Sequence, residues 1–103
     1  MNLQEFESVM QKNASDAEAL SQKETDERMR SILLMQASMY RDMLTVLGKR
    51  ELQGHRGTLS KILKTLEERH NLYTEKGDFD AADREKIKMD TVRRVIGLVN
   101  GEA

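Results

Sequence analysis

The chain has 103 residues, of which 38% are hydrophobic and 34% charged, and it contains no proline, cysteine or tryptophan. A chain of this length forms one domain with a modest core, which leaves no room for a large cofactor beside a substrate pocket. The formal net charge of -1 creates no basic field that would attract nucleic acid or an anionic membrane. The lack of cysteine excludes disulfides, thiolate metal sites and cysteine nucleophiles, and it fits a reducing cytoplasmic location.

Neither targeting nor membrane insertion is predicted. The first ten residues carry two glutamates where a signal peptide has basic residues. The longest apolar run, residues 32 to 35, is too short to span a bilayer. We therefore expect no membrane contact.

The composition favours helix throughout, because Glu, Lys, Gln, Leu, Met and Ala are abundant and no stretch alternates with a period of two. We expect an all-α fold in which residues 1–103 form a single elongated helical bundle. Its N-terminal helix is long and either runs through residues 13–25 or breaks there. Its C-terminal part is an antiparallel helical hairpin.

The first segment has a heptad pattern. Its seam consists of six residues at alternating spacings of three and four: Leu3, Phe6, Met10, Asn13, Ala17 and Leu20. Ser15 and Glu18 have the spacing of a capping box, which predicts a helix start there and a separate or flexible first helix over residues 1–14. The same pattern also fits one continuous helix.

The apolar pattern of the next segment is wider. Two rows share one half of the helix surface between residues 28 and 47: Ile32, Met35, Met39, Met43 and Val46 form one row, and Met29, Leu33, Tyr40, Leu44 and Leu47 form the other. A helix with so wide an apolar face needs partners on more than one side. Gly48 is expected to end this helix as a C-cap.

The C-terminal half predicts a loop and then a hairpin. Three glycines between residues 48 and 57 indicate a long loop, and Thr58 is a candidate cap for the third helix. Gly77 is expected to end that helix and Asp78 to cap the fourth, which ends near Asn100. Because almost no connector remains between them, residues 58–100 should form an antiparallel hairpin.

Helix length suggests self-association. A helix from Asp16 to Leu47 would be roughly 48 Å long at 1.5 Å per residue, whereas a domain of about 100 residues has a radius of gyration near 13 Å. Either this helix breaks around Thr25, or another chain covers its exposed apolar part. We favour the second interpretation, a homodimer or larger oligomer.

Charge is unevenly distributed along the chain. Residues 1–30 carry four basic and seven acidic residues, whereas residues 41–76 carry eight basic and five acidic ones. The basic residues around the predicted loop could bind phosphate or nucleic acid, or could pair with the acidic N-terminal segment of the same or another chain. They are Arg41, Lys49, Arg50, Arg56, Lys61 and Lys64.

Two short segments resemble known families. Residues 57–70, GTLSKILKTLEERH, resemble the recognition helix of MarR-type winged-helix repressors, and Asp80, Asp83 and Arg84 are similar to charged residues of their wing. This resemblance implies DNA binding through a basic helix at 56–69, with Lys49, Arg50, Arg56, Lys61 and Lys64 as the contacts. A wing needs two strands, however, and the residues after His70 have a helical pattern.

The second resemblance concerns residues 75–89, EKGDFDAADREKIKM, which are similar to the UVR hairpin of excision-repair proteins. That hairpin pairs helices between protein partners. The match rests on Asp78, Phe79, Asp80 and Ala82, and it fails where the family has an Arg-Asp pair and this chain has Lys86 and Ile87. Acidic residues at a helix start are also what capping selects, so we interpret the segment as a helical hairpin.

No catalytic, cofactor or metal site is predicted. Glu67 and His70 have the Glu-x-x-His spacing of di-iron bundles, but such a site needs two motifs and two further glutamates. We therefore expect His70 to be a partly buried core histidine. With only two histidines, no cysteine and no phosphate-binding glycine motif, nothing activates a nucleophile.

The function that the sequence favours is protein–protein interaction without catalysis, as in a homo-oligomeric adaptor, chaperone-like or assembly protein. The flexible methionine side chain suits surfaces that repack around different partners. The expected partners are another copy of the chain and another protein, with a small DNA-binding regulator as the alternative and a metal-bearing bundle as the third. The predicted contacts are Phe6, Met10, Met29, Ile32, Met35, Met39, Tyr40, Met43, Met89, Val92 and Ile96.

Overall fold

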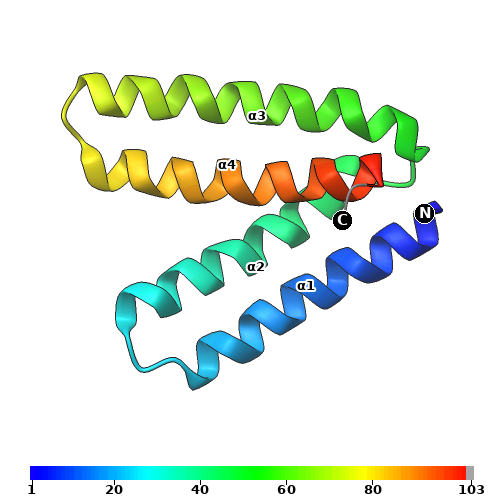
Figure 1. Cartoon of the computed structure of the whole chain (residues 1–103), viewed down its shortest axis with the longest axis horizontal. Coiled ribbons are helices and arrows are strands. Elements are labelled where there is room, and N and C mark those ends of the chain that lie inside the picture. Colours follow the sequence, from blue (N-terminus) through cyan, green and yellow to red (C-terminus); the bar gives the residue numbers. More distant parts are fainter. Residues whose placement is uncertain (102–103) are drawn as a thin grey trace. The chain divides into compact units, whose positions relative to one another are not determined.

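The computed structural model describes residues 1–101 and places four α-helices and no strand among them. The helices are α1 (Leu3–Lys23), α2 (Glu27–Leu47), α3 (Leu52–Glu75) and α4 (Phe79–Asn100) (Figure 1). The all-α fold class is therefore confirmed. The chain divides into two compact units, Met1–Leu52 and Gln53–Ala103. We call them the N-terminal and the C-terminal hairpin and describe each by itself.

The N-terminal hairpin consists of α1 and α2, which pack against each other in antiparallel directions (Figure 1). The long helix considered between Asp16 and Leu47 is broken at Glu24–Asp26, as in the alternative with a break around Thr25. The favoured arrangement was an unbroken helix covered by another chain. Its unbroken helix is wrong, and its oligomer stays a prediction. Most of the apolar surface of α1 is covered by this chain itself.

Polar groups stabilise the break. The side chain of Asp26 caps α2 by accepting hydrogen bonds from the amides of Arg28 and Met29. The carbonyl of Glu24 is exposed by the end of α1 and accepts two hydrogen bonds from the Arg30 guanidinium, at 2.7 and 3.2 Å. Each helix end is thereby supplied with a partner for backbone groups that would otherwise lack one.

The capping box predicted at Ser15 and Glu18 does not form, because α1 is continuous from Leu3 to Lys23. A capping box operates only where the backbone leaves the helix, and here the helical hydrogen bonds continue through it. Residues 1–14 are thus not a separate helix.

The buried face of α1 differs from the heptad seam in its second half. The buried residues are Phe6, Met10, Ala14, Ala17 and Ser21, so Asn13 and Leu20 are displaced by their neighbours. A straight α-helix drifts by about 20° per heptad relative to a 3.5-residue repeat. After two heptads the drift is about 40°, so Ser21 lies nearer the buried face than Leu20, which is left 57% exposed.

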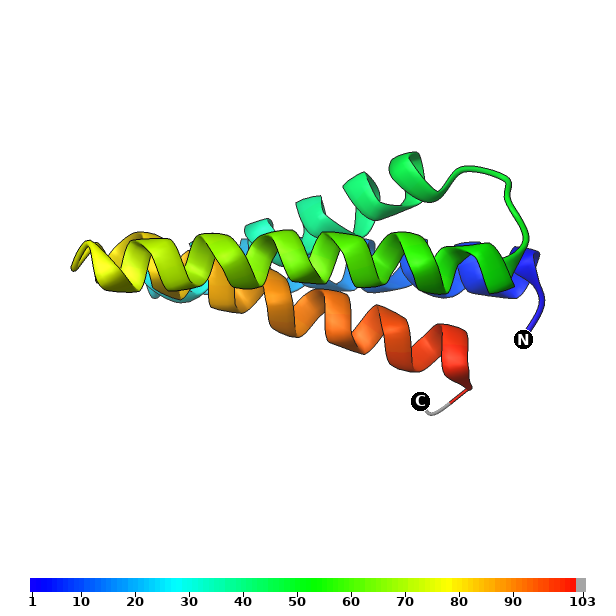
Figure 2. The ribbon, with the colours of Figure 1, turned by 90° about the horizontal axis from the view of Figure 1, so that it is seen from above.

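The C-terminal hairpin consists of α3 and α4, as predicted. Residues 76–78 reverse the chain: Gly77 has a φ of 76°, which favours glycine, and the amide of Asp78 donates to the carbonyl of Tyr73 at 2.9 Å. Asp78 caps α4 by accepting from the amide of Ala81. Figure 2 shows α3 and α4 from a second direction, in which they separate towards the C-terminal end of α4.

The loop predicted over residues 48–57 is shorter than expected. Gly48 ends α2 with a φ of 60°, as predicted, but α3 already begins at Leu52. Gly54 and Gly57 therefore lie inside the helix, and Thr58 does not cap it. Burial outweighs the low helix propensity of glycine here, because His55 and Leu59 point from this turn into the interior.

The sequence predicts no membrane-inserted segment, and the length and apolarity of the helices bear on this prediction. No helix within residues 1–101 has the length and apolarity that crossing a bilayer requires.

The helical state of residues 52–57 predicts a stabilising substitution. A Cβ atom at Gly54 or Gly57 would meet nothing within 4 Å. Because glycine costs about 0.5–1 kcal/mol relative to alanine inside a helix, Gly54→Ala together with Gly57→Ala should raise the free energy of unfolding by about 1–2 kcal/mol. Urea denaturation measures it, with Gly77→Ala as the control that should destabilise. No gain from the double substitution would contradict a helix here.

Candidate interaction surface

Four predicted contact residues of α1 and α2 are buried in the structure. Phe6 and Met10 of α1 are fully buried, and Tyr40 and Met43 of α2 are only 6% and 2% exposed. A partner cannot reach them unless the hairpin opens. They therefore serve the stability of the hairpin, and the surface available for recognition is smaller than the sequence predicted.

A second row of apolar side chains lies on α2 beside this interior face. We call it the second apolar face of α2, and it consists of Ile32, Met35, Met39 and Val46. At 100° per residue the mean direction of these four is roughly a quarter turn away from that of the buried Tyr40 and Leu47. Ile32, Met35 and Met39 are half-buried, and Val46 is 55% exposed.

Met29 is the remaining predicted contact on α2. It lies in the first turn of the helix, next to the break, and is 44% exposed. At 100° per residue it lies on the side of Tyr40 rather than on the second apolar face. It is exposed because α1 ends at Lys23 and offers little to cover it.

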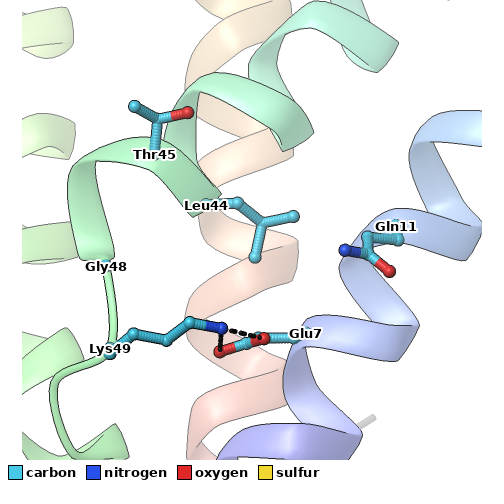
Figure 3. Close-up of a pocket in the computed structure, with 6 residues that line it drawn as sticks. All are labelled: Glu7, Gln11, Leu44, Thr45, Gly48 and Lys49. Carbon is cyan, nitrogen blue, oxygen red and sulfur yellow. Dashed lines mark hydrogen bonds and ion pairs between the residues drawn. The ribbon is translucent and has the colours of Figure 1, made fainter.

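The other flank of the N-terminal hairpin is polar. There the ammonium of Lys49 lies 2.9 and 3.1 Å from the two carboxylate oxygens of Glu7, and Arg41 forms an ion pair with Glu18. These ion pairs connect α1 to α2 and to the residue after its C-cap. Figure 3 shows the first of them at the edge of a pocket of about 210 Å³ whose lining is Glu7, Gln11, Leu44, Thr45, Gly48 and Lys49.

This pocket offers little for chemistry. The one carboxylate in its lining is held by Lys49, and none of the lining residues is a histidine or a cysteine. An exposed ion pair of this kind contributes at most about 1 kcal/mol to stability. The ion pair thus connects α1 to the residue after the C-cap of α2, and the lining of the pocket assembles no reactive group.

The predicted basic patch is divided among different places. Arg41 and Lys49 pair with the acidic residues of α1, which matches the intrachain alternative considered above. Arg50 is exposed in the connector, while Arg56, Lys61 and Lys64 are exposed on α3. Arg56 and Lys61 lie about 140° apart around that helix, so they do not face one ligand together.

The predicted contacts on α4 are largely interior. Met89 is 8% exposed and Val92 is fully buried, while Ile96 is half-buried. They lie on the same side of α4 as Ala82, at spacings of three and four residues. Like Phe6 and Met10, these side chains hold a hairpin together.

Glu85 is a buried acidic residue in this apolar row. Its side chain is 7% exposed; one carboxylate oxygen lies 3.6 Å from the ammonium of Lys88 and the other accepts no hydrogen bond. Burying a carboxylate without full compensation costs stability. Glu85 is the most evident destabilising group of the C-terminal hairpin.

The Glu-x-x-His motif forms no metal centre in the part of the chain that the structure describes. The carboxylate of Glu67 lies 3.6 Å from the guanidinium of Arg93, so it joins α3 to α4. His70 is half-buried, as expected. Within residues 1–101 no three side chains of the ligating types come together around one point.

Replacing the buried carboxylate by an apolar side chain should stabilise the protein. A buried polar atom without a partner costs about 1–3 kcal/mol, and Lys88, which is 30% exposed, stays solvated when the carboxylate is removed, so Glu85→Leu should raise the free energy of unfolding by about 1 kcal/mol or more. Thermal and urea denaturation measure it. Glu85→Gln is the matched control, since it keeps a buried polar group and should gain less. A less stable Glu85→Leu variant would show that the carboxylate has a partner in solution.

The ion pair between Glu18 and Arg41 predicts a pH effect. The hydrogen bond from Arg41 holds the pKa of the Glu18 carboxyl below its ordinary value of 4.5, against an opposing contribution from desolvation. A pKa lowered by folding contributes stability above the unfolded value, and the contribution is lost as the pH falls through the folded one. Arg41→Gln should therefore destabilise the protein at pH 7 and progressively less below pH 4.5. A penalty independent of pH between 7 and 3 would contradict this.

Comparison with known proteins assigns no family. No protein-family model matches the sequence, and no curated protein or solved structure shows significant similarity to it. The function is therefore inferred from the residues and the geometry described above.

Proposed function

We propose that this protein is a non-enzymatic helical interaction module that holds another protein against the second apolar face of α2. The observation that carries the proposal is the width of the apolar surface on α2. One side of this helix carries the buried Tyr40, Met43 and Leu47, and the half-buried Ile32, Met35 and Met39 form a further row beside it. An amphipathic helix of the partner, with apolar residues three and four positions apart, suits such a row.

The chemistry of the row supports recognition of more than one sequence. Met35 and Met39 are unbranched, so their side chains adapt to differently shaped partners at little cost. Val46 and Leu20 are large apolar residues with more than half of their surface exposed. Apolar residues gathered on one surface are typical of interaction sites.

In this proposal α1 does not hold the partner through its acidic residues. Its acidic side chain Glu18 pairs with Arg41 of α2, and Glu7 pairs with Lys49, which follows α2. Both carboxylates are thus engaged within the hairpin and are not free to hold a partner. Self-association remains part of the proposal as a prediction. Since the helix break removes the argument from length, its remaining support is the apolar surface, and sedimentation at micromolar concentration tests it.

Two methionines one turn apart on α2 test the proposal. Met39 is half-buried on the second apolar face, whereas Met43 is 2% exposed in the interior. Met39→Glu should keep the helical circular dichroism signal and lose a partner captured from the native cell. Met43→Glu should unfold the hairpin, because it buries a carboxylate without a partner.

Affinity capture with each variant, followed by mass spectrometry, provides the comparison. Thr45→Glu is the control for added charge, since Thr45 is exposed on the polar flank of the same helix. Retention of every captured protein by a folded Met39→Glu variant would refute the proposal. Unfolding of Met39→Glu would show that this residue belongs to the core.

A further inference from the structure

A shallow hollow lies along one side of α3. It has a volume of about 260 Å³, and its lining comes from two successive turns of this helix: Lys61, Ile62, Thr65, Leu66 and Arg69. Its floor is apolar, because Leu66 is 6% exposed and Ile62 is half-buried. The hydroxyl of Thr65 donates to the carbonyl of Lys61 at 3.1 Å, so its polar group is already engaged with the helix backbone.

A cation stands at each end of the hollow. Lys61 and Arg69 are both exposed and are eight residues apart, which separates their Cα atoms by about 12 Å along the helix axis. No ion pair within residues 1–101 uses either side chain. The N-terminal hairpin differs, since Arg41 and Lys49 are already paired with carboxylates there.

We infer that this hollow is a docking site for an acidic amphipathic helix of a partner protein, which places an apolar side chain between Lys61 and Arg69 and a carboxylate on each of them. Two carboxylates eight residues apart on the incoming helix match the separation of the two cations. The apolar side chain packs mainly on Ile62, because Leu66 below it is only 6% exposed. Charge complementarity fixes the position of the partner, and the apolar contact supplies affinity.

The hollow suits a peptide better than a nucleic acid. A phosphate backbone could reach the two cations, but it would leave the apolar floor between them uncovered. The lining of the hollow contains no aromatic side chain on which a base could stack.

The hollow also suits a separate protein better than a second copy of α1. Three of the four acidic residues of that helix, Glu7, Asp16 and Glu18, are already paired with Lys49, Lys12 and Arg41. The fourth, Glu5, has Asn13 and no acid eight residues further on. A second copy would have to break these pairs before its α1 could supply the two carboxylates. The site is distinct from the second apolar face of α2, so the two proposals can fail independently.

The test is a binding measurement with a synthetic helical peptide. The probe is a fluorescent alanine-rich peptide of about 20 residues, long enough to be helical in water, with a leucine flanked by glutamates four residues before and four after it. The control probe has glutamine in place of both glutamates. Fluorescence anisotropy with the full chain should show saturable binding of the first probe, weakened by salt, and at least tenfold weaker binding of the second.

The same helix offers a matched pair of variants. Lys61→Glu with Arg69→Glu reverses both cations of the hollow and should weaken binding at least tenfold, because like charges are then opposed. Arg56→Glu with Lys64→Glu makes the same change in net charge at the same spacing of eight residues, on another side of α3. This second variant should bind within about twofold of the unmodified chain. Circular dichroism confirms that both remain helical.

Several results would overturn the inference. They are the absence of saturable binding up to about 1 mM, equal weakening in both double variants, equal binding of the glutamine probe, and displacement of the probe by duplex DNA at physiological salt. A lower sedimentation mass of the Lys61→Glu, Arg69→Glu variant would also overturn it, because the occupant would then be a second copy. None of these measurements involves Met39, so they leave the proposed function untouched.

Discussion

The reversal of the chain at Glu24–Asp26 determines how much of α2 is covered. Were α1 and α2 one helix, the wide apolar surface of residues 28–47 would have no partner within the N-terminal half of the chain. Because the chain turns, α1 packs against α2, and Phe6, Met10, Tyr40 and Met43 are all buried. The cost of ending two helices is reduced by local groups, since Asp26 caps α2 and Arg30 binds the carbonyl left free at Glu24.

The reversal also gives the N-terminal hairpin two different flanks. On one flank the ion pairs of Glu7 with Lys49 and of Glu18 with Arg41 connect the helices across a polar surface. Near the other lie Ile32, Met35 and Met39 of the second apolar face. Each flank of the hairpin is made of one flank of α1 and one flank of α2. The position of a residue in the sequence determines its flank, so the separation of polar from apolar residues follows from the sequence. The proposed function depends on that asymmetry.

Local signals predicted the helices and most of their ends. Gly48, Gly77 and Asp78 act as expected because their roles depend only on nearby residues. The two glycines adopt a positive φ, and Asp78 accepts a hydrogen bond from the amide of Ala81. The capping box at Ser15 and the loop over residues 52–57 were wrong for the opposite reason. Whether a cap forms, or a glycine is held in a helix, depends on what the segment packs against, and the burial of His55 and Leu59 decides the second case.

The candidate surfaces were harder to predict. The apolar spacing on α2 shows that two faces exist, but it does not tell which face α1 covers, so Tyr40 and Met39 looked equivalent. Contacts with distant partners, such as Lys49 with Glu7, are set by the pairing of helices and leave no local pattern. The hollow on α3 is of the same kind. Lys61 was named among the basic residues and Arg69 was not, and only the structure places the two around one hollow.

A distance measurement tests the fold-back at Glu24–Asp26 most directly. The chain has no cysteine, so Ser8→Cys with Thr45→Cys introduces two spin labels at exposed positions, and dilution with unlabelled chain removes signals between chains. Double electron–electron resonance should give a separation below roughly 30 Å, because paired helices lie 8–10 Å apart and the labels add flexible linkers. A separation near 55 Å, the length of 37 helical residues at about 1.5 Å each, would mean one unbroken helix and would contradict the account.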